Sequence, residues 1–262
     1  MKIVKNILIW IVMFTYLGVL FSFINKEHNT NICKSIHVSI VDDTDNHFIV
    51  KEDVFTLLSD KRIDLVGEKL SKMNRSALEE VLDKHPTIKK SQIYNNHLGI
   101  VSIDITQRKP IVRVVNQNEE SYYIDEEGFL MPLSDNFSAH VIIANGYLNE
   151  SYNSNNKQNV VVNNKKNGGS EKLRAIYTLA SFINADPFWK AQIEQIYFNR
   201  KGEIELAPRV GTHIIIFGNI VDYKEKFRKL RAVYDQGFKK TGWNKYRIIN
   251  LKYKDQVICT KK

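Results

Sequence analysis

The chain has 262 residues, of which 43% are hydrophobic and 11% aromatic, a composition that supports a folded core and excludes an intrinsically disordered chain. The formal net charge is +9, of which Lys2 and Lys5 supply +2, so the remaining residues carry +7 (9 − 2). Only two cysteines occur and no Cys-x-x-Cys motif, which excludes a disulfide-dense scaffold; Cys33 and Cys259 are expected to be separate thiols rather than a bridge.

The first element is an apolar run, Ile7–Ile24, that contains no charged residue. As an α-helix it would span about 27 Å, close to the roughly 30 Å hydrocarbon core of a bilayer, so we expect a transmembrane helix in contact with lipid. Lys2 and Lys5 precede it, which predicts a short cytoplasmic tail over residues 1–6 and an extracytoplasmic body over residues 25–262. A cleaved signal peptide and a buried core helix are the alternatives.

This topology predicts an inner-membrane protein whose basic body lies outside the cytoplasm. There a basic surface meets lipid headgroups, wall polymers or acidic proteins, so nucleic acid is not expected as a partner. An abundance of lysine on solvated faces is the simpler explanation of the charge.

Residues 25–110 show the pattern of a small α+β domain with one sheet. Apolar residues alternate in the strands and recur on one side of short helices. The expected order is strand, helix, helix, strand, strand: Lys34–Val41, Val50–Leu58, a helix capped by Asn74 and ended by Pro86, Thr87–Tyr94 and Leu98–Thr106.

A domain boundary is predicted near residue 110, where Gln107-Arg108-Lys109-Pro110 precedes a new apolar strand. Proline fixes φ and lacks an N–H, so it interrupts a strand ladder and redirects the chain. We therefore expect Arg108 and Pro110 to form the junction between two domains.

Residues 111–262 predict a larger mixed sheet flanked by helices. The expected strands are Ile111–Asn116, Tyr122–Asp125, Phe129–Leu133, His140–Ala144, Ile193–Asn199, Glu203–Leu206, Thr212–Phe217, Tyr246–Leu251 and Gln256–Thr260. The expected helices are Leu173–Ile183 and Asp222–Phe238, and an Asn-rich surface loop is expected over 148–170. The basic residues of the last helix are interpreted as its solvated side, or as a surface for lipid or an acidic partner: Lys224, Lys226, Arg228, Lys229 and Arg231.

The sequence contains no pattern typical of an active site. Gly-x-Ser-x-Gly, His-Glu-x-x-His and phosphate-loop motifs are missing, and the seven histidines are scattered. Asp125, Glu126 and Glu127 are interpreted as a hairpin turn, with a catalytic or calcium-binding group as the alternative. We therefore expect no enzyme, no cofactor, no metal and no small-molecule substrate.

Three segments carry a resemblance to a known family. The order of the first domain resembles a POTRA domain, and Gln107–Val112 resembles the Glu-Arg-x-Pro-apolar junction of the FtsQ/DivIB bacterial division proteins. Arg108 and Pro110 match that junction, whereas Gln107 replaces the acid. Tyr123-Ile124-Asp125-x-x-Gly128-x-x-x-Pro132-Leu133 and Ile249-Asn250-Leu251-Lys252-Tyr253 resemble the start and the end of the family's second domain, with Asn250 replacing an acid and Lys252 an arginine.

This resemblance implies a non-catalytic divisome scaffold at the septum. Such a protein would bind FtsB, FtsL and other division proteins, and it would help to control septal wall synthesis. A POTRA-type polypeptide-binding component of an export or envelope-assembly system is one alternative, and a membrane-anchored wall hydrolase is another.

Strand addition is the mechanism that we hypothesise for partner binding. The last predicted strand lies at a sheet edge, where free N–H and C=O groups can pair with a partner, unless the chain itself covers that edge. The candidate partner-binding residues are Arg247, Tyr253, Gln256, Val257, Ile258, Cys259 and Thr260.

Overall fold

The computed structural model describes residues 10–19, 31–41, 47–152, 159–161, 170–238, 242–243 and 245–262. The predicted tail over residues 1–6 lies outside this part of the chain, as does most of the Asn-rich segment 148–170. Contacts divide the chain into two units. The first includes Ile49–Gln107; the second includes Arg108–Lys262 together with Phe48.

The prediction of a transmembrane helix over Ile7–Ile24 is wrong. The structure describes a helix over residues 10–19, ten residues in all. Across the described ranges, no helix combines the length and the apolar character that crossing a membrane requires.

The first unit is a three-stranded sheet with helices, as the sequence predicted. Its sheet has the order β1-β3-β2, in which β1 runs parallel and β2 antiparallel to β3. The elements are β1 (Ser35–Ile40), α2 (Lys51–Asp60), the 3₁₀ turn η1 (Leu70–Lys72), α3 (Arg75–Asp83), β2 (Ile88–Asn95) and β3 (Ile100–Gln107).

Helix α3 begins where the sequence predicted. The Asn74 side-chain oxygen accepts a hydrogen bond from the Ala77 N–H at 3.1 Å, which satisfies one of the free donors of the first turn. Leu78 and Leu82 lie one turn apart on its buried face and join the core of the first unit.

Two carboxylates of α3 cover the outer edge of β2. The Ser91 N–H donates to Asp83 Oδ1 at 2.6 Å, and the Ile93 N–H donates to Glu79 Oε1 at 2.7 Å. Sheet order leaves β2 at an edge, so these donors have no strand to pair with. The helix therefore satisfies backbone groups that would otherwise be free to pair with another chain.

The second unit is built on a nine-stranded mixed sheet of order β12-β11-β10-β9-β8-β7-β4-β5-β6. Its strands are β4 (Pro110–Val115), β5 (Ser121–Asp125), β6 (Leu130–Met131), β7 (Ile142–Gly146), β8 (Ile193–Phe198), β9 (Ile204–Pro208), β10 (Ile214–Gly218), β11 (Tyr246–Asn250) and β12 (Ile258–Lys261). Its helices are α4 (Glu171–Ala185), α5 (Pro187–Gln192), α6 (Tyr223–Ala232) and the π-helical turn η3 (Val233–Phe238).

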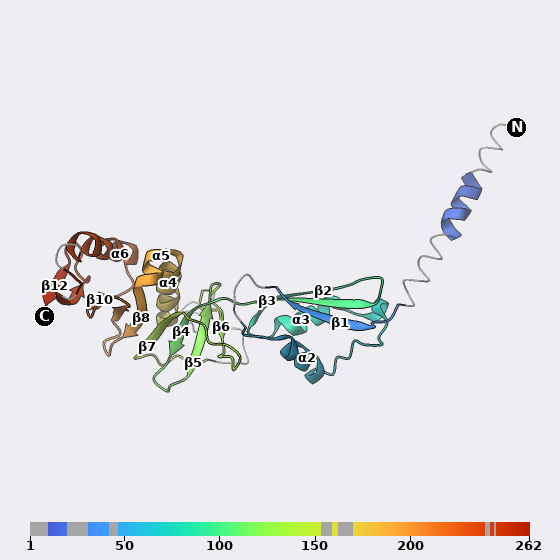
Figure 1. The fold of residues 1–262 in the computed structure, drawn as a ribbon, viewed down its shortest axis with the longest axis horizontal. Coiled ribbons are helices and arrows are strands. Elements are labelled where there is room, and N and C mark those ends of the chain that lie inside the picture. Colours follow the sequence, from blue (N-terminus) through green and yellow to red (C-terminus); the bar gives the residue numbers. More distant parts are fainter. Residues whose placement is uncertain are drawn as a thin grey trace. The chain divides into compact units, whose positions relative to one another are not determined.

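The helices of this unit pack on one face of the sheet, and Figure 1 shows α4, α5 and α6 on the same side of the strands. The strand residues that face them include Ala144, Ile196, Leu206, Ile215 and Ile249, all fully buried. Their neighbours along each strand point to the other face, because side chains alternate across a sheet. Over β8 to β11 that second face carries the pocket described below.

Toward β5 and β6 the second face is covered by a small aromatic cluster. Phe48 packs edge-on against Tyr123 and Phe137, with ring centroids 5.5 and 5.1 Å apart. The Ser134 hydroxyl donates to the Phe48 carbonyl at 3.0 Å and fixes this segment. The cluster buries Tyr123 of β5 and Met131 of β6 on this face.

Candidate partner-binding edge and adjoining pocket

Strand β12 forms one edge of the large sheet. It pairs antiparallel with β11, with Cys259 opposite Ile249 and Ile258 opposite Asn250. Within the described residues, no strand lies beyond it. The Ile258 side chain is 41% exposed, although it is large and apolar. An exposed edge of this kind offers backbone donors and acceptors to a further strand.

The structure brings most of the candidate partner-binding residues to this edge. Ile258, Cys259 and Thr260 lie in β12, and Arg247 is exposed on the adjacent strand β11. Gln256 and Val257 precede the strand, and Tyr253 lies in the connection between β11 and β12. The two faces of β12 differ: Cys259 packs against the main core, whereas Ile258 lies beside Asn250 on the opposite face.

Two lysines hold the connection that leads into β12. Lys229 of α6 donates from Nζ to the carbonyl oxygens of Tyr253 at 2.6 Å and Lys254 at 3.1 Å. Lys252 forms an ion pair with Glu203. Sequence reasoning missed both roles, since it interpreted Lys229 as part of a solvated helix side. The sequence carries no local signal for either contact, because Lys229 meets Tyr253 across 24 positions and Lys252 meets Glu203 across 49.

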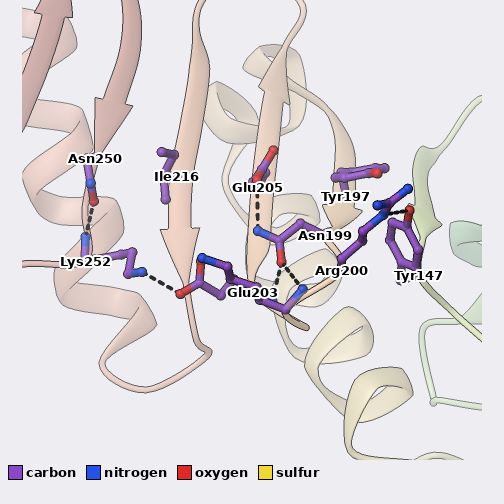
Figure 2. A pocket seen from close by; sticks show the side chains of 10 residues that line it. Tyr147, Tyr197, Asn199, Arg200, Glu203, Glu205, Ile216, Asn250 and Lys252 are labelled. Atoms are coloured by element: carbon purple, nitrogen blue, oxygen red, sulfur yellow. Dashed lines mark hydrogen bonds and ion pairs between the residues drawn. The ribbon is translucent and has the colours of Figure 1, made fainter.

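A pocket lies beside this edge, on the face of the sheet that has no helices (Figure 2). It has a volume of about 440 Å³ and spans β8 to β11. In Figure 2 the side chains lie in front of the strands and bond mostly to one another: Arg200 donates to the Tyr147 hydroxyl, and Asn199 donates to Glu205. The lining residues are Tyr147, Tyr197, Asn199, Arg200, Lys201, Glu203, Glu205, Ile216, Asn250 and Lys252.

One of the two junction residues, Arg108, forms a buried ion pair with Asp125. Arg108 Nη1 donates to Asp125 Oδ2 at 2.7 Å, and both side chains are almost fully buried. Burial raises the pKa of the Asp125 carboxyl, against the opposing effect of the hydrogen bond from Arg108. Pro110 begins β4, where a missing N–H is tolerated at the first residue of a strand.

The carboxylate of Asp125 also shapes the following turn. Its Oδ1 atom accepts the backbone N–H groups of Glu127 at 2.9 Å and Phe129 at 2.7 Å. These bonds close the connection from β5 to β6, which pair antiparallel. Asp125 therefore serves as a turn residue and as the partner of Arg108, a pairing that sequence reasoning did not identify.

Fold and edge together define a class of protein: a POTRA-like module followed by a mixed-sheet domain with an open terminal strand. Comparison with family models agrees with this description. A model described as POTRA-like domain matches residues 31–106, and one described as FtsQ/DivIB, C-terminal related, matches residues 109–260. The second match covers 152 (260 − 109 + 1) of the 262 residues, so the chain belongs to the FtsQ/DivIB, C-terminal related, family. Comparison with curated proteins finds no match.

The family assignment confirms the resemblance to FtsQ/DivIB proteins that the junction and the terminal strands indicated. It supports, in general terms, a scaffold role in bacterial cell division that acts through contacts between proteins. FtsQ/DivIB proteins and POTRA domains are generally non-catalytic.

Proposed function

We propose that this chain is a divisome scaffold that captures FtsB- and FtsL-type proteins by strand addition to β12. It acts at the division septum, outside the cytoplasm, and takes part in the control of septal wall synthesis. One observation carries the proposal: β12 ends the large sheet with its outer edge exposed. Such an edge gives a partner affinity through main-chain hydrogen bonds.

The contrast with the other sheet supports β12 as the binding edge. In the first unit, Glu79 and Asp83 already occupy the outward N–H groups of β2. In the part of the chain that the structure describes, no side chain bonds to the outer edge of β12. At the opposite end of the large sheet, β6 has only two residues, too few for a stable ladder.

The charge around β12 indicates the chemistry of the partner. Residues 245–262 contain six Lys and Arg and one Asp, a net charge of +5 (6 − 1). Arg247 is exposed next to the edge. Complementary charge raises the rate of encounter and disfavours wrong partners. We therefore expect the captured segment to be an extended stretch that carries acidic residues.

A proline in β12 tests strand addition directly. The register with β11 directs the Ile258 N–H toward Asn250 and leaves the Cys259 N–H on the outer edge. Cys259→Pro removes this outward N–H, whereas the matched variant Cys259→Ala loses the same side chain and keeps the N–H. We expect a purified FtsB-type segment to bind Cys259→Ala within about threefold of wild type and to bind Cys259→Pro at least about tenfold more weakly. Circular dichroism checks that both variants are folded. Equal binding to the two variants would refute strand addition at this position.

Imaging of a tagged protein in dividing cells tests the proposed location. A band at mid-cell supports a role at the septum, whereas a uniform envelope signal opposes it. The same imaging of Cys259→Pro tests whether this chain still reaches mid-cell when its capture of partners is impaired.

A further inference from the structure

Lys226 is a buried cation that forms no ion pair with any described residue. The residue is 8% exposed and lies in the first turns of α6, where the sequence predicted a solvated side. Its Nζ donates to the carbonyl oxygen of Asn219 at 2.7 Å and to Asn219 Oδ1 at 2.9 Å. In the part of the chain that the structure describes, no acidic oxygen lies within 4.0 Å of this nitrogen, and one of its three hydrogens has no acceptor.

The surroundings of Lys226 disfavour its charge. Burial lowers the pKa of its ammonium group and the nearby Lys229 lowers it further, whereas the charge of Asp222 has a smaller, opposite effect. The Phe217 ring lies 5.0 Å from Nζ and compensates in part through a cation–π contact. A buried cation usually gains a counter-charge, because neutral oxygens replace only part of its hydration.

Lys226 lines a cavity of about 280 Å³ together with two more lysines. Lys201 comes from the β8–β9 turn and Lys252 from the end of β11, so three separate segments deliver amines to one hollow. Gly218 has φ +79°, and a Cβ there would lie 2.9 Å from Lys252 Cγ, so glycine leaves space for that lysine. The full lining is Lys201, Gly202, Glu203, Gly218, Asn219, Lys226 and Lys252.

The charges of this cavity do not cancel. Three lysines and one glutamate give +2 (3 − 1), and Glu203 is already engaged by Lys252. A carboxylate would neutralise half of this charge, whereas a phosphate dianion matches it and accepts hydrogen bonds on several oxygens. The volume exceeds that of a single phosphate and leaves space for an attached organic group.

We propose that this cavity is a phosphate-binding site in which Lys226, Lys201 and Lys252 hold the oxyanion. Lys226 donates its free hydrogen to one phosphate oxygen from a buried position. Lys201 and Lys252 approach from the cavity rim, as point charges of the kind that bind phosphate. The site is independent of β12 strand addition, because its ligand contacts side chains and not the free strand edge.

A titration of the whole chain with inorganic phosphate tests the site. Lysine side-chain NMR signals are followed at constant ionic strength, with chloride as the control for general screening. We expect saturable shifts of the Lys226 signal and weaker binding, by about tenfold or more, in Lys226→Met and in Lys252→Met. The matched control is Lys224→Met, which removes an exposed lysine from the same helix and should bind within about twofold of wild type.

A second arm uses glycerol 3-phosphate in place of inorganic phosphate. Tighter binding of the ester assigns the site to a phosphorylated molecule, whereas tighter binding of the free ion assigns it to phosphate itself. Either result supports the site if Lys226→Met abolishes the binding. Lys252 is 42% exposed along its side chain, so Lys252→Met remains informative even if Lys226→Met does not fold. Shifts that chloride reproduces, or equal losses in Lys224→Met and the two site variants, would overturn the proposal.

Discussion

Arg108 and Asp125 form an ion pair in the interior of the second unit, with Nη1 and Oδ2 2.7 Å apart and side chains only 4% and 1% exposed. The guanidinium also lies over the Phe129 ring, 4.1 Å from its centre. Asp125 in turn holds the backbone of the β5–β6 turn. The pair therefore links Arg108, which directly follows the first unit, to strands β5 and β6 at one end of the large sheet.

Loss of Arg108 should destabilise the second unit strongly. Arg108→Ala leaves the Asp125 carboxylate buried without a cation, and breaking a buried pair in this way costs about 3–5 kcal/mol. Urea unfolding followed by the fluorescence of Trp189 and Trp243 measures the loss, because both tryptophans belong to this unit. The control is Arg113→Ala, which removes a hydrogen bond to Ser121 and should cost about 1 kcal/mol. Similar losses of unfolding free energy in the two variants would show that the buried ion pair stabilises the unit no more than a single hydrogen bond does.

Removal of the two α3 carboxylates should open the edge of β2. In Glu79→Ala with Asp83→Ala, the N–H groups of Ser91 and Ile93 lose their acceptors. We expect a loss of about 1–3 kcal/mol per unsatisfied donor and self-association that increases with protein concentration, as an exposed edge permits. Sedimentation velocity measures the association.

The matched control for this edge is Glu80→Ala on the same helix. Glu80 pairs with Lys84 at the surface, where both side chains are about 70% exposed, so its loss should have little effect. A monomeric double variant would mean that the carboxylates do not protect this edge from pairing.

His213 predicts a loss of stability at mildly acidic pH. It is buried, and desolvation lowers its pKa from 6.5 to about 4. Its Nε2 lies 2.9 Å from the Tyr234 hydroxyl, whereas its Nδ1 has no partner among the described residues. The unfolded chain therefore binds a proton that the folded chain does not bind between pH 6.5 and 4.

The sign of this effect follows from linkage. Stability from the neutral His213 is fully present above pH 6.5 and falls as the pH drops toward 4, by up to about 3 kcal/mol. Urea unfolding at several pH values should show this slope in wild type and a shallower one in His213→Leu. The exposed His140 provides the control, since His140→Gln should keep the wild-type slope. Equal slopes in wild type and His213→Leu would contradict the assignment.

Local sequence patterns predicted the parts of the fold that depend on neighbours along the chain. The alternation in β3 and the Asn74 cap of α3 are examples, because strand period and capping involve only a few consecutive residues. The same logic placed a strand at the end of the chain, where β12 covers Ile258–Lys261.

Features that depend on distant residues were not predictable in the same way. Hydropathy over Ile7–Ile24 predicted a spanning helix, whereas no helix in the described ranges has the length and apolar character to span a membrane. The expected single helix Asp222–Phe238 is divided into α6 and the π-helical turn η3, and the periodic spacing of its apolar residues carried no signal for this change of helix type. Arg108 meets Asp125 across 17 positions, and Lys226 is buried by the Asn219 loop, contacts that only the folded chain creates.

Lys229 should order the edge strand through the connection that precedes it. Its ammonium bonds to the carbonyl oxygens of Tyr253 and Lys254, a few residues before β12 begins at Ile258. In Lys229→Met these two acceptors lose their donor, and the segment samples more open conformations. We expect faster amide hydrogen exchange in β12 and no change in β8 or β9. Because less of the strand is then pre-formed, an FtsB-type segment should bind about three- to tenfold more weakly. Arg228→Met is the matched control, since Arg228 bonds only to Glu225 on the exposed side of the same helix in the described structure. If the exchange of β12 amides were equal in the two variants, Lys229 would not position the edge, and any loss of binding would have another cause.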